Sequence, residues 1–185
     1  MLKDLLVQAE QRMQGTIRSL EEEMSGIRTG RASPGLVEHL SVEYYGTPTP
    51  LLQLAAIGAP EPQLITIRPY DPSSLNTIEK AILSSDLGLT PSNDGKLIRL
   101  SIPPLTEERR QDLVKIVSKR LEEAKVSIRN IRRDALEDMR KLEKDKQVSE
   151  DDFFAAKDDL QKLTDHYTEE IESVGTRKEQ EIMEV

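Results

Sequence analysis

Apolar residues recur at intervals of three and four near both ends of the chain. A period close to 3.6 predicts amphipathic helices, each of which buries one face. Three such stripes are present: Leu6, Ala9, Met13, Ile17, Leu20, Met24 and Ile27; then Leu113, Val117, Leu121, Ala124, Ile128, Ile131, Ala135, Met139 and Leu142; then Phe153, Ala156, Leu160, Leu163, Tyr167, Ile171, Val174 and Ile182. Three helices with such stripes are expected to pack as an elongated antiparallel three-helix bundle.

Capping residues mark where the second and third helices begin. Thr106 follows Pro103-Pro104, which block a helix before them, and Ser149 precedes the third stripe. Both side chains are good acceptors for the free N–H groups of a first helical turn. The second helix should run from about Thr106 to Lys146, on the order of 60 Å at 1.5 Å per residue.

The middle of the chain has a different character. All ten prolines lie between Pro34 and Pro104. One helix is expected there, with Asp71 as its cap, Pro72 in its first position and Gly88 just past its end. Asp94-Gly95 is typical of a hairpin turn. Alternating apolar residues predict short strands at Leu40, Val42 and Tyr44; at Leu52, Leu54 and Ala56; at Ile65 and Ile67; and at Ile98, Leu100 and Ile102.

These patterns predict an α+β chain of two domains. Residues 1–30 and 105–185 form the discontinuous helical bundle, and residues 31–104 form an inserted small α/β domain. The chain crosses between the domains near Gly30-Arg31 and near Pro103-Pro104. Two short crossings permit bending and restrict twisting, so a hinge and a rigid elbow are both open interpretations.

The composition gives little support for an enzymatic function. The chain has no cysteine, and its two histidines, His39 and His166, fall in different expected domains. No phosphate-binding glycine motif and no metal-ligand spacing is present, so an enzyme ranks last among the function classes. No apolar run approaches the roughly 20 residues of a membrane span. The first residues include Asp4 and Glu10, which is untypical of a secretion signal, so a cytoplasmic protein is expected.

Charge is distributed unevenly within a net charge of −8. Residues 109–146 hold 13 Lys/Arg and 8 Asp/Glu, whereas residues 149–185 hold 4 and 12. On a helical wheel of about 100° per residue, the second helix has a basic flank beside its apolar seam and a more acidic flank opposite. The basic flank comprises Lys125, Arg129, Arg132, Arg133 and Arg140; the acidic flank comprises Glu123, Ser127, Asp134, Glu137 and Asp138.

Two interpretations of the basic flank remain open. In the first, it pairs internally with the acidic third helix, and the protein is a structural adaptor. In the second, it binds nucleic acid, which guanidinium groups favour because their planar fork matches phosphate geometry. Screening over about 10 Å at 0.1 M salt allows such a patch to act locally in an acidic protein.

Four separated blocks resemble the ribosome recycling factor family, in order and over the whole chain. They are Ile27–Pro34 (IRTGRASP), Ser85–Pro91 (SDLGLTP) followed by Asn93–Lys96 (NDGK), Ile102–Arg110 (IPPLTEERR) and Val126–Asp134 (VSIRNIRRD). The resemblance implies an L-shaped molecule of a three-helix bundle and a small α/β domain. It also implies a monomer that binds no nucleotide, metal or other cofactor and catalyses no bond change.

The family resemblance implies partners and site residues as well. The expected partners are the ribosome, through its large-subunit rRNA, and elongation factor G, which uses GTP to split the subunits and so release mRNA and tRNA. Contact with rRNA is carried over onto Arg129, Arg132, Arg133 and Lys125, and onto Arg28 and Arg31. Hinge roles are carried over onto Gly30, Arg31, Pro103 and Pro104. We expect the affinity for the ribosome to fall as salt rises, because phosphate contacts release counterions.

Overall fold

The computed structural model describes residues 1–184, which divide into two compact units. One unit comprises residues 1–24 and 111–180, and the other comprises residues 25–110 together with the last residues from Glu181 on. The boundaries expected from the sequence, after Gly30 and before Leu105, lie a few residues from these limits and remain a prediction.

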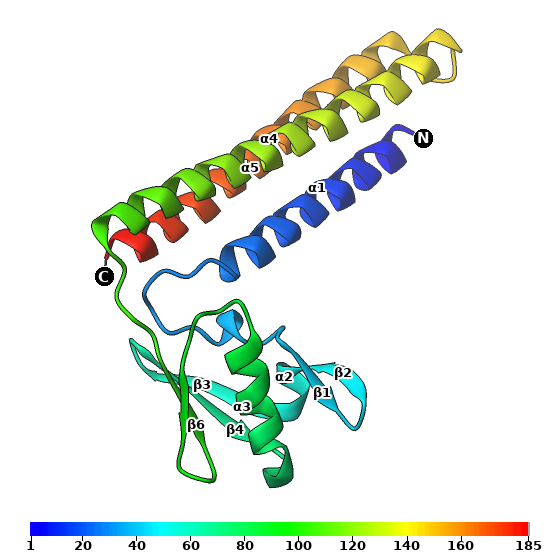
Figure 1. The fold of residues 1–185 in the computed structure, drawn as a ribbon. Coiled ribbons are helices and arrows are strands. Elements are labelled where there is room, and N and C mark those ends of the chain that lie inside the picture. The colour runs from blue at the N-terminus through cyan, green and yellow to red at the C-terminus, as the bar shows by residue number, and fades with distance from the viewer. Residues whose placement is uncertain (185) are drawn as a thin grey trace. The chain divides into compact units, whose positions relative to one another are not determined.

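The first unit is built from three long helices, as the apolar stripes predict. They are α1 (Leu2–Ser25), α4 (Glu107–Lys144) and α5 (Glu150–Met183). Figure 1 shows α4 and α5 running antiparallel, joined at one end by a short turn. Met13, Ile128, Met139, Leu160 and Ile171 are almost completely buried between the helices. Burial of each such side chain stabilises the fold by about 1.5–3 kcal/mol, so the shared seam holds the bundle together.

The predicted helix starts are confirmed by their cap hydrogen bonds. The Thr106 hydroxyl accepts from the backbone N–H of Arg109 at 3.1 Å, and the Ser149 hydroxyl accepts from that of Asp152 at 3.0 Å. In the other unit, Asp71 caps a 3₁₀ turn over Pro72–Ser74 that leads directly into α3 (Leu75–Ser84). Each cap satisfies an N–H group that the helix cannot pair by itself.

The second unit contains two antiparallel sheets. A hairpin joins β1 (Ser41–Tyr44) to β2 (Thr47–Pro50). The larger sheet has the order β3-β4-β6-β5, and its strands are β3 (Ala55–Glu61), β4 (Leu64–Pro69), β5 (Pro91–Asn93) and β6 (Ile98–Ser101). Side chains of α3 pack with the inward-facing residues of β4 and β6 in one apolar core: Ile65, Ile67, Ile78, Ile82, Ile98 and Leu100.

The strand predicted over Leu52, Leu54 and Ala56 is wrong in its first half. Residues Leu51–Leu54 form a single helical turn, α2, and β3 begins only at Ala55. Leu51 and Leu54 are both buried, three residues apart, whereas Leu52 is exposed. The spacing of these buried residues is therefore helical, and of the three alternating residues only Ala56 lies in a strand.

Two short strands that contain proline were not predicted. Pro48 and Pro50 lie in β2, and Pro91 begins β5. Each of these strands has only one hydrogen-bonded neighbour, so it lies at the edge of its sheet. An edge strand tolerates proline because the missing N–H costs no ladder hydrogen bond when that side faces away from the neighbour.

Candidate nucleic-acid interface

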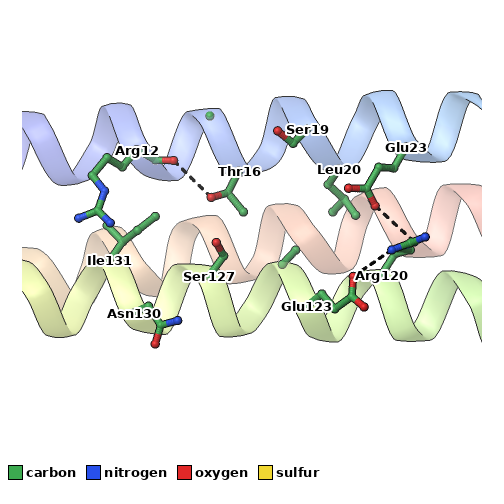
Figure 2. A pocket seen from close by; sticks show the side chains of 12 residues that line it. Arg12, Thr16, Ser19, Leu20, Glu23, Arg120, Glu123, Ser127, Asn130 and Ile131 are labelled. Carbon is green, nitrogen blue, oxygen red and sulfur yellow. Dashed lines mark hydrogen bonds and ion pairs between the residues drawn. The ribbon is translucent and has the colours of Figure 1, made fainter.

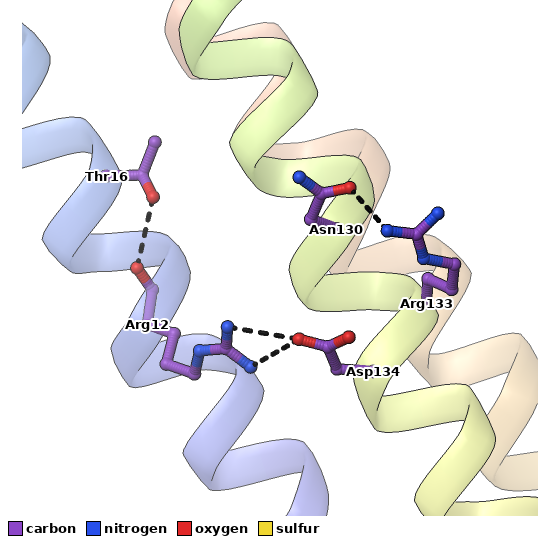
Figure 3. Close-up of polar contacts among 5 residues, drawn as sticks. All are labelled: Arg12, Thr16, Asn130, Arg133 and Asp134. Atoms are coloured by element: carbon purple, nitrogen blue, oxygen red, sulfur yellow. Dashed lines mark hydrogen bonds and ion pairs between the residues drawn. The ribbon is translucent and has the colours of Figure 1, made fainter.

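Part of the acidic flank of α4 lies beside α1 and is paired with arginines there. Both terminal nitrogens of Arg12 donate to Asp134 Oδ2 at 3.3 Å, and Figure 3 shows this pair bridging the two helices. Arg120 pairs with Glu23 of α1 at 3.5 Å and with Glu123 at 3.2 Å. Carboxylates of this flank are thus matched by guanidinium groups that do not belong to the predicted site.

A groove of about 640 Å³ runs between α1 and α4, with these pairs along it. Figure 2 shows its polar lining from Thr16, Ser19, Ser127 and Asn130. The two carboxylates that line the groove, Glu23 and Glu123, are both ion-paired with Arg120. Among residues 1–184, no group of three or more His, Asp and Glu side chains is arranged to hold a metal ion.

On the opposite flank, two of the predicted residues reach α5. Lys125 Nζ lies 2.6 Å from Glu172 Oε1, and only 28% of the lysine side chain is exposed. The hydrogen bond and the positive charge of Lys125 lower the pKa of the Glu172 carboxyl. Arg132 Nη1 donates to the side-chain carbonyl of Gln161 at 2.8 Å. Gln161 is a neutral partner, so the charge of Arg132 is not cancelled by this contact.

The other predicted residues of α4 lie further out. Arg129 Nη2 donates to Glu122 of the same helix at 2.8 Å, with both side chains more than half exposed. Arg133 Nη2 donates to Asn130 Oδ1 at 3.0 Å, on the side of α4 turned away from α1 (Figure 3). Arg140 is exposed. Within the described part of the chain, neither Arg133 nor Arg140 has a carboxylate within ion-pair distance.

Internal neutralisation of the basic flank is therefore incomplete. Lys125 and Arg129 have carboxylate partners, whereas Arg132 and Arg133 have amide partners. Exposed ion pairs are weak, typically below about 1 kcal/mol, so a phosphate that forms charge-assisted bonds can compete with them. The geometry leaves a surface of positive charge along one side of α4.

Arg28 and Arg31 belong to the other unit. Arg28 Nη1 donates to the backbone carbonyl of Leu87 at 2.5 Å, so this guanidinium holds the loop after α3. Arg31 is exposed, and its neighbour Gly30 has φ +76°, a conformation that glycine adopts without strain. These two arginines and the arginines of α4 therefore lie in different units.

Both predicted crossings leave the small unit beside the same turn. The N–H of Ala32 donates to the carbonyl of Pro62 at 2.6 Å, and the N–H of Ile102 donates to that of Gln63 at 2.8 Å. Pro62 and Gln63 connect β3 to β4. Pro103 and Pro104, which follow Ile102, are exposed and have no N–H to anchor.

Comparison with known proteins gives a consistent result. A family model described as "Ribosome recycling factor" matches residues 20–183. Ribosome-recycling factors of Dehalococcoides mccartyi and Shouchella clausii are each 54% identical over 185 residues, with 100% of both chains covered.

Two solved structures are similar over nearly the whole chain. A solution structure of a ribosome recycling factor has a TM-score of 0.80 and 44% identity, covering 100% of this chain and 98% of that one. A second, described as models for the T. thermophilus ribosome recycling factor and the E. coli elongation factor G bound to the E. coli post-termination complex, has a TM-score of 0.71 and 46% identity, with 99% of each chain covered. With relatives this similar over their full length, the chain belongs to the ribosome recycling factor family.

Proposed function

We propose that this protein binds the post-termination ribosome through the basic flank of α4 and, with elongation factor G and GTP, promotes separation of the subunits and release of mRNA and tRNA. Arg132 and Arg133 support this proposal most directly, because among residues 1–184 the hydrogen-bond partners of their guanidinium groups are neutral amides. The phosphates of large-subunit rRNA are the expected ligands. Membership in a family of translation factors supports the same partner, and a solved relative is described together with elongation factor G on a post-termination complex.

In this proposal the protein acts by binding and catalyses no bond change itself. GTP is used by elongation factor G, and the recycling factor works as a monomer in the cytoplasm, where the ribosomes are. No helix among residues 1–184 is both long enough and apolar enough to cross a membrane. Detectable GTP hydrolysis by the purified chain alone would contradict the binding-only role.

The two crossings between the domains supply the hinge. Gly30-Arg31 and Pro103-Pro104 lie next to Ala32 and Ile102, which are each fixed by a backbone hydrogen bond to the turn between β3 and β4. Bending on either side of these anchors leaves both the core of the small unit and the packing of the bundle intact. Arg28 and Arg31 are proposed as further rRNA contacts beside this hinge.

The arginine assignment is tested by ribosome co-sedimentation of Arg132→Ala and Arg133→Ala over a range of salt concentrations. Each substitution should weaken binding several-fold and reduce the slope of log K against log salt by about one, because one phosphate contact is lost. Helicity measured by circular dichroism should stay close to that of the parent, since both side chains lie outside the apolar seam.

Arg177→Ala is the matched control for this test. It removes the same charge from an exposed site on α5, where the arginine lies 4.0 Å from Glu21, and it should bind ribosomes like the parent. If Arg132→Ala and Arg133→Ala also bind like the parent at moderate salt, the arginine assignment fails.

The alternative function is a structural helical adaptor. The ion pairs of Lys125 with Glu172 and of Arg129 with Glu122 favour it, because they cancel part of the basic flank. An adaptor of this kind would remain in the supernatant with ribosomes present, at low salt as well as at high salt.

A further inference from the structure

The turn between β1 and β2 places a bulky residue in an unfavourable backbone conformation. Tyr44 pairs with Thr47, so Tyr45 and Gly46 form a two-residue loop, and their φ angles are +49° and +76°. Two positive φ values are typical of a type I′ turn, for which Asn-Gly is the preferred sequence. Tyrosine in the first position brings its Cβ too close to the backbone, a strain that asparagine tolerates better.

Folding does not compensate for this strain. The Tyr45 side chain is 84% exposed, so little of its apolar surface is removed from water. Its ring lies edge-on to that of Tyr44, with centroids 4.5 Å apart and an interplanar angle of 74°. A strained and exposed aromatic residue on an otherwise regular hairpin indicates a functional role for the side chain.

The groups around Tyr45 are held in fixed positions. The Tyr44 hydroxyl donates to Asp71 Oδ2 at 3.0 Å, and Asp71 Oδ1 accepts from the backbone N–H and the hydroxyl of Ser73 at 3.0 and 2.7 Å. The Ser73 and Tyr44 hydrogen bonds lower the pKa of the Asp71 carboxyl, which therefore stays ionised. Two steeply inclined rings and a carboxylate are thus preorganised at one end of the hairpin.

The chemistry of this cluster selects a cation. Aromatic ring faces and a carboxylate both attract a positively charged group. Residues 41–50 and 69–77 hold two charged side chains, Glu43 and Asp71, and both are acidic. Arg68, the nearest basic residue along the chain, donates no hydrogen bond to this cluster within the described structure. Phosphate is repelled by such surroundings, whereas the alkyl stem of Lys or Arg can also cover an exposed ring.

We propose that Tyr44, Tyr45 and Asp71 form a docking site for a lysine or arginine side chain on the surface of a protein partner. This site rests on the proposed function, since the partner is expected among the proteins that the factor meets on the ribosome. It is separate from the arginines of α4, which take phosphate, and it gives the small unit a protein-binding role of its own.

Site-specific photocrosslinking identifies the chemical class of the partner. A benzophenone amino acid replaces Tyr45 in the full-length protein, which is then bound to purified post-termination ribosomes with purified elongation factor G. The expected product is a crosslink to a protein segment that carries Lys or Arg within a few residues of the attachment point. The control places the same probe at Leu83, an exposed residue of α3, where that crosslink should be absent. The site would be overturned by a crosslink to RNA or to a protein segment without basic residues. It would also be overturned if the factor still sediments with ribosomes and forms no crosslink.

Substitution at Tyr45 separates partner binding from folding. Tyr45→Asn should raise the melting temperature, because asparagine accepts a positive φ, yet weaken binding to the ribosome–elongation factor G complex by about threefold to tenfold. Tyr45→Phe should bind nearly as the parent does, and Asp71→Asn, which keeps an acceptor for Ser73, should weaken binding.

A lower melting temperature for Tyr45→Asn would assign the residue a structural role instead. Unchanged binding by Tyr45→Asn would reject this site alone, whereas a parent protein that does not bind ribosomes would reject the proposed function as well.

Discussion

At the scale of single residues, the positively charged groups of α4 differ in what they contact. The helical wheel places Lys125, Arg129, Arg132 and Arg133 on one flank, because each residue advances by a fixed angle. Their partners depend on how α5 is aligned with α4, and this alignment is a property of the packed bundle. Glu172 and Gln161 therefore did not emerge from the sequence as partners of Lys125 and Arg132, although both lie on the helix that the sequence identified as acidic.

The ion pair between Lys125 and Glu172 should limit the affinity of the protein for the ribosome. The variant Glu172→Gln releases Lys125 to meet phosphate, so binding should become tighter by a few-fold. The slope of log K against log salt should steepen by up to about one. Co-sedimentation or fluorescence titration with purified ribosomes at several salt concentrations measures both quantities.

Asp159→Asn provides the matched control, since it removes the same charge from an exposed residue of α5 that has no ion pair within the described structure. At about 100° per residue, Asp159 and Glu172 point roughly 140° apart around the helix. The control should therefore change binding far less than Glu172→Gln does. If the two variants gain affinity equally, the gain reflects overall charge and Lys125 has no special role.

At the scale of elements, local sequence signals determined the long helices. Thr106 and Ser149 begin helices as predicted, because a cap depends only on residues two or three positions away. Asp71 caps a 3₁₀ turn, and the α-helix predicted there begins only at Leu75. The weak elements were missed or assigned wrongly. The strands β2 and β5 contain proline, and α2 is a single helical turn. The two strands are held by hydrogen bonds to neighbouring strands, β1 and β6. The helical turn is held by the burial of Leu51 and Leu54 and by the bond from the Leu51 N–H to the carbonyl of Leu40 at 2.9 Å.

The packing of α4 against α5 depends on Gly175. A Cβ built on this buried glycine would overlap Cδ1 of Leu121. In an open helix, Gly→Ala stabilises by about 1 kcal/mol. We expect Gly175→Ala to leave the free energy of unfolding unchanged or to lower it, because Leu121 must move. In a Leu121→Ala background, Gly175→Ala should raise the free energy of unfolding. Urea denaturation of the four variants of this double-mutant cycle measures the coupling, expected to be on the order of 1 kcal/mol.

Gly15 of α1 is the control for helix propensity alone. The nearest atom to an added Cβ there is Arg18 Nη2 at 4.0 Å, so Gly15→Ala should stabilise in every background. Additive effects of Gly175→Ala and Leu121→Ala would contradict a steric coupling between the two helices.

At the scale of the whole molecule, the helical bundle is interrupted in sequence by the small domain but not in its core. The buried residues of α1, α4 and α5 form a continuous seam within one unit, and the apolar core of the sheet lies within the other. Each unit has the features of an independent folding domain. The domain limits inferred from the sequence can therefore be tested by deletion.

Replacing residues 32–103 with a short flexible linker should leave a folded bundle. The seam residues all remain, and a short loop is sufficient to join helices in a bundle. Circular dichroism should show high helicity, and thermal unfolding should be cooperative. A product that unfolds without a cooperative transition would mean that the bundle depends on the inserted domain.

The sequence by itself determined the three long helices, the caps at Thr106 and Ser149, the inserted domain and the side of α4 on which positive charge gathers. All of these follow from spacing along the chain, which local backbone geometry converts directly into faces and ends. Only the tertiary structure decided which arginines are matched by carboxylates, how the proline-containing strands pair, and that Tyr44, Tyr45 and Asp71 meet. The pairs between α4 and α5 and the bond of Tyr44 to Asp71 join segments far apart in the sequence, so they depend on how whole elements pack. The proline-containing strands pair with near neighbours in the sequence, but proline hides them from a pattern of β-forming residues.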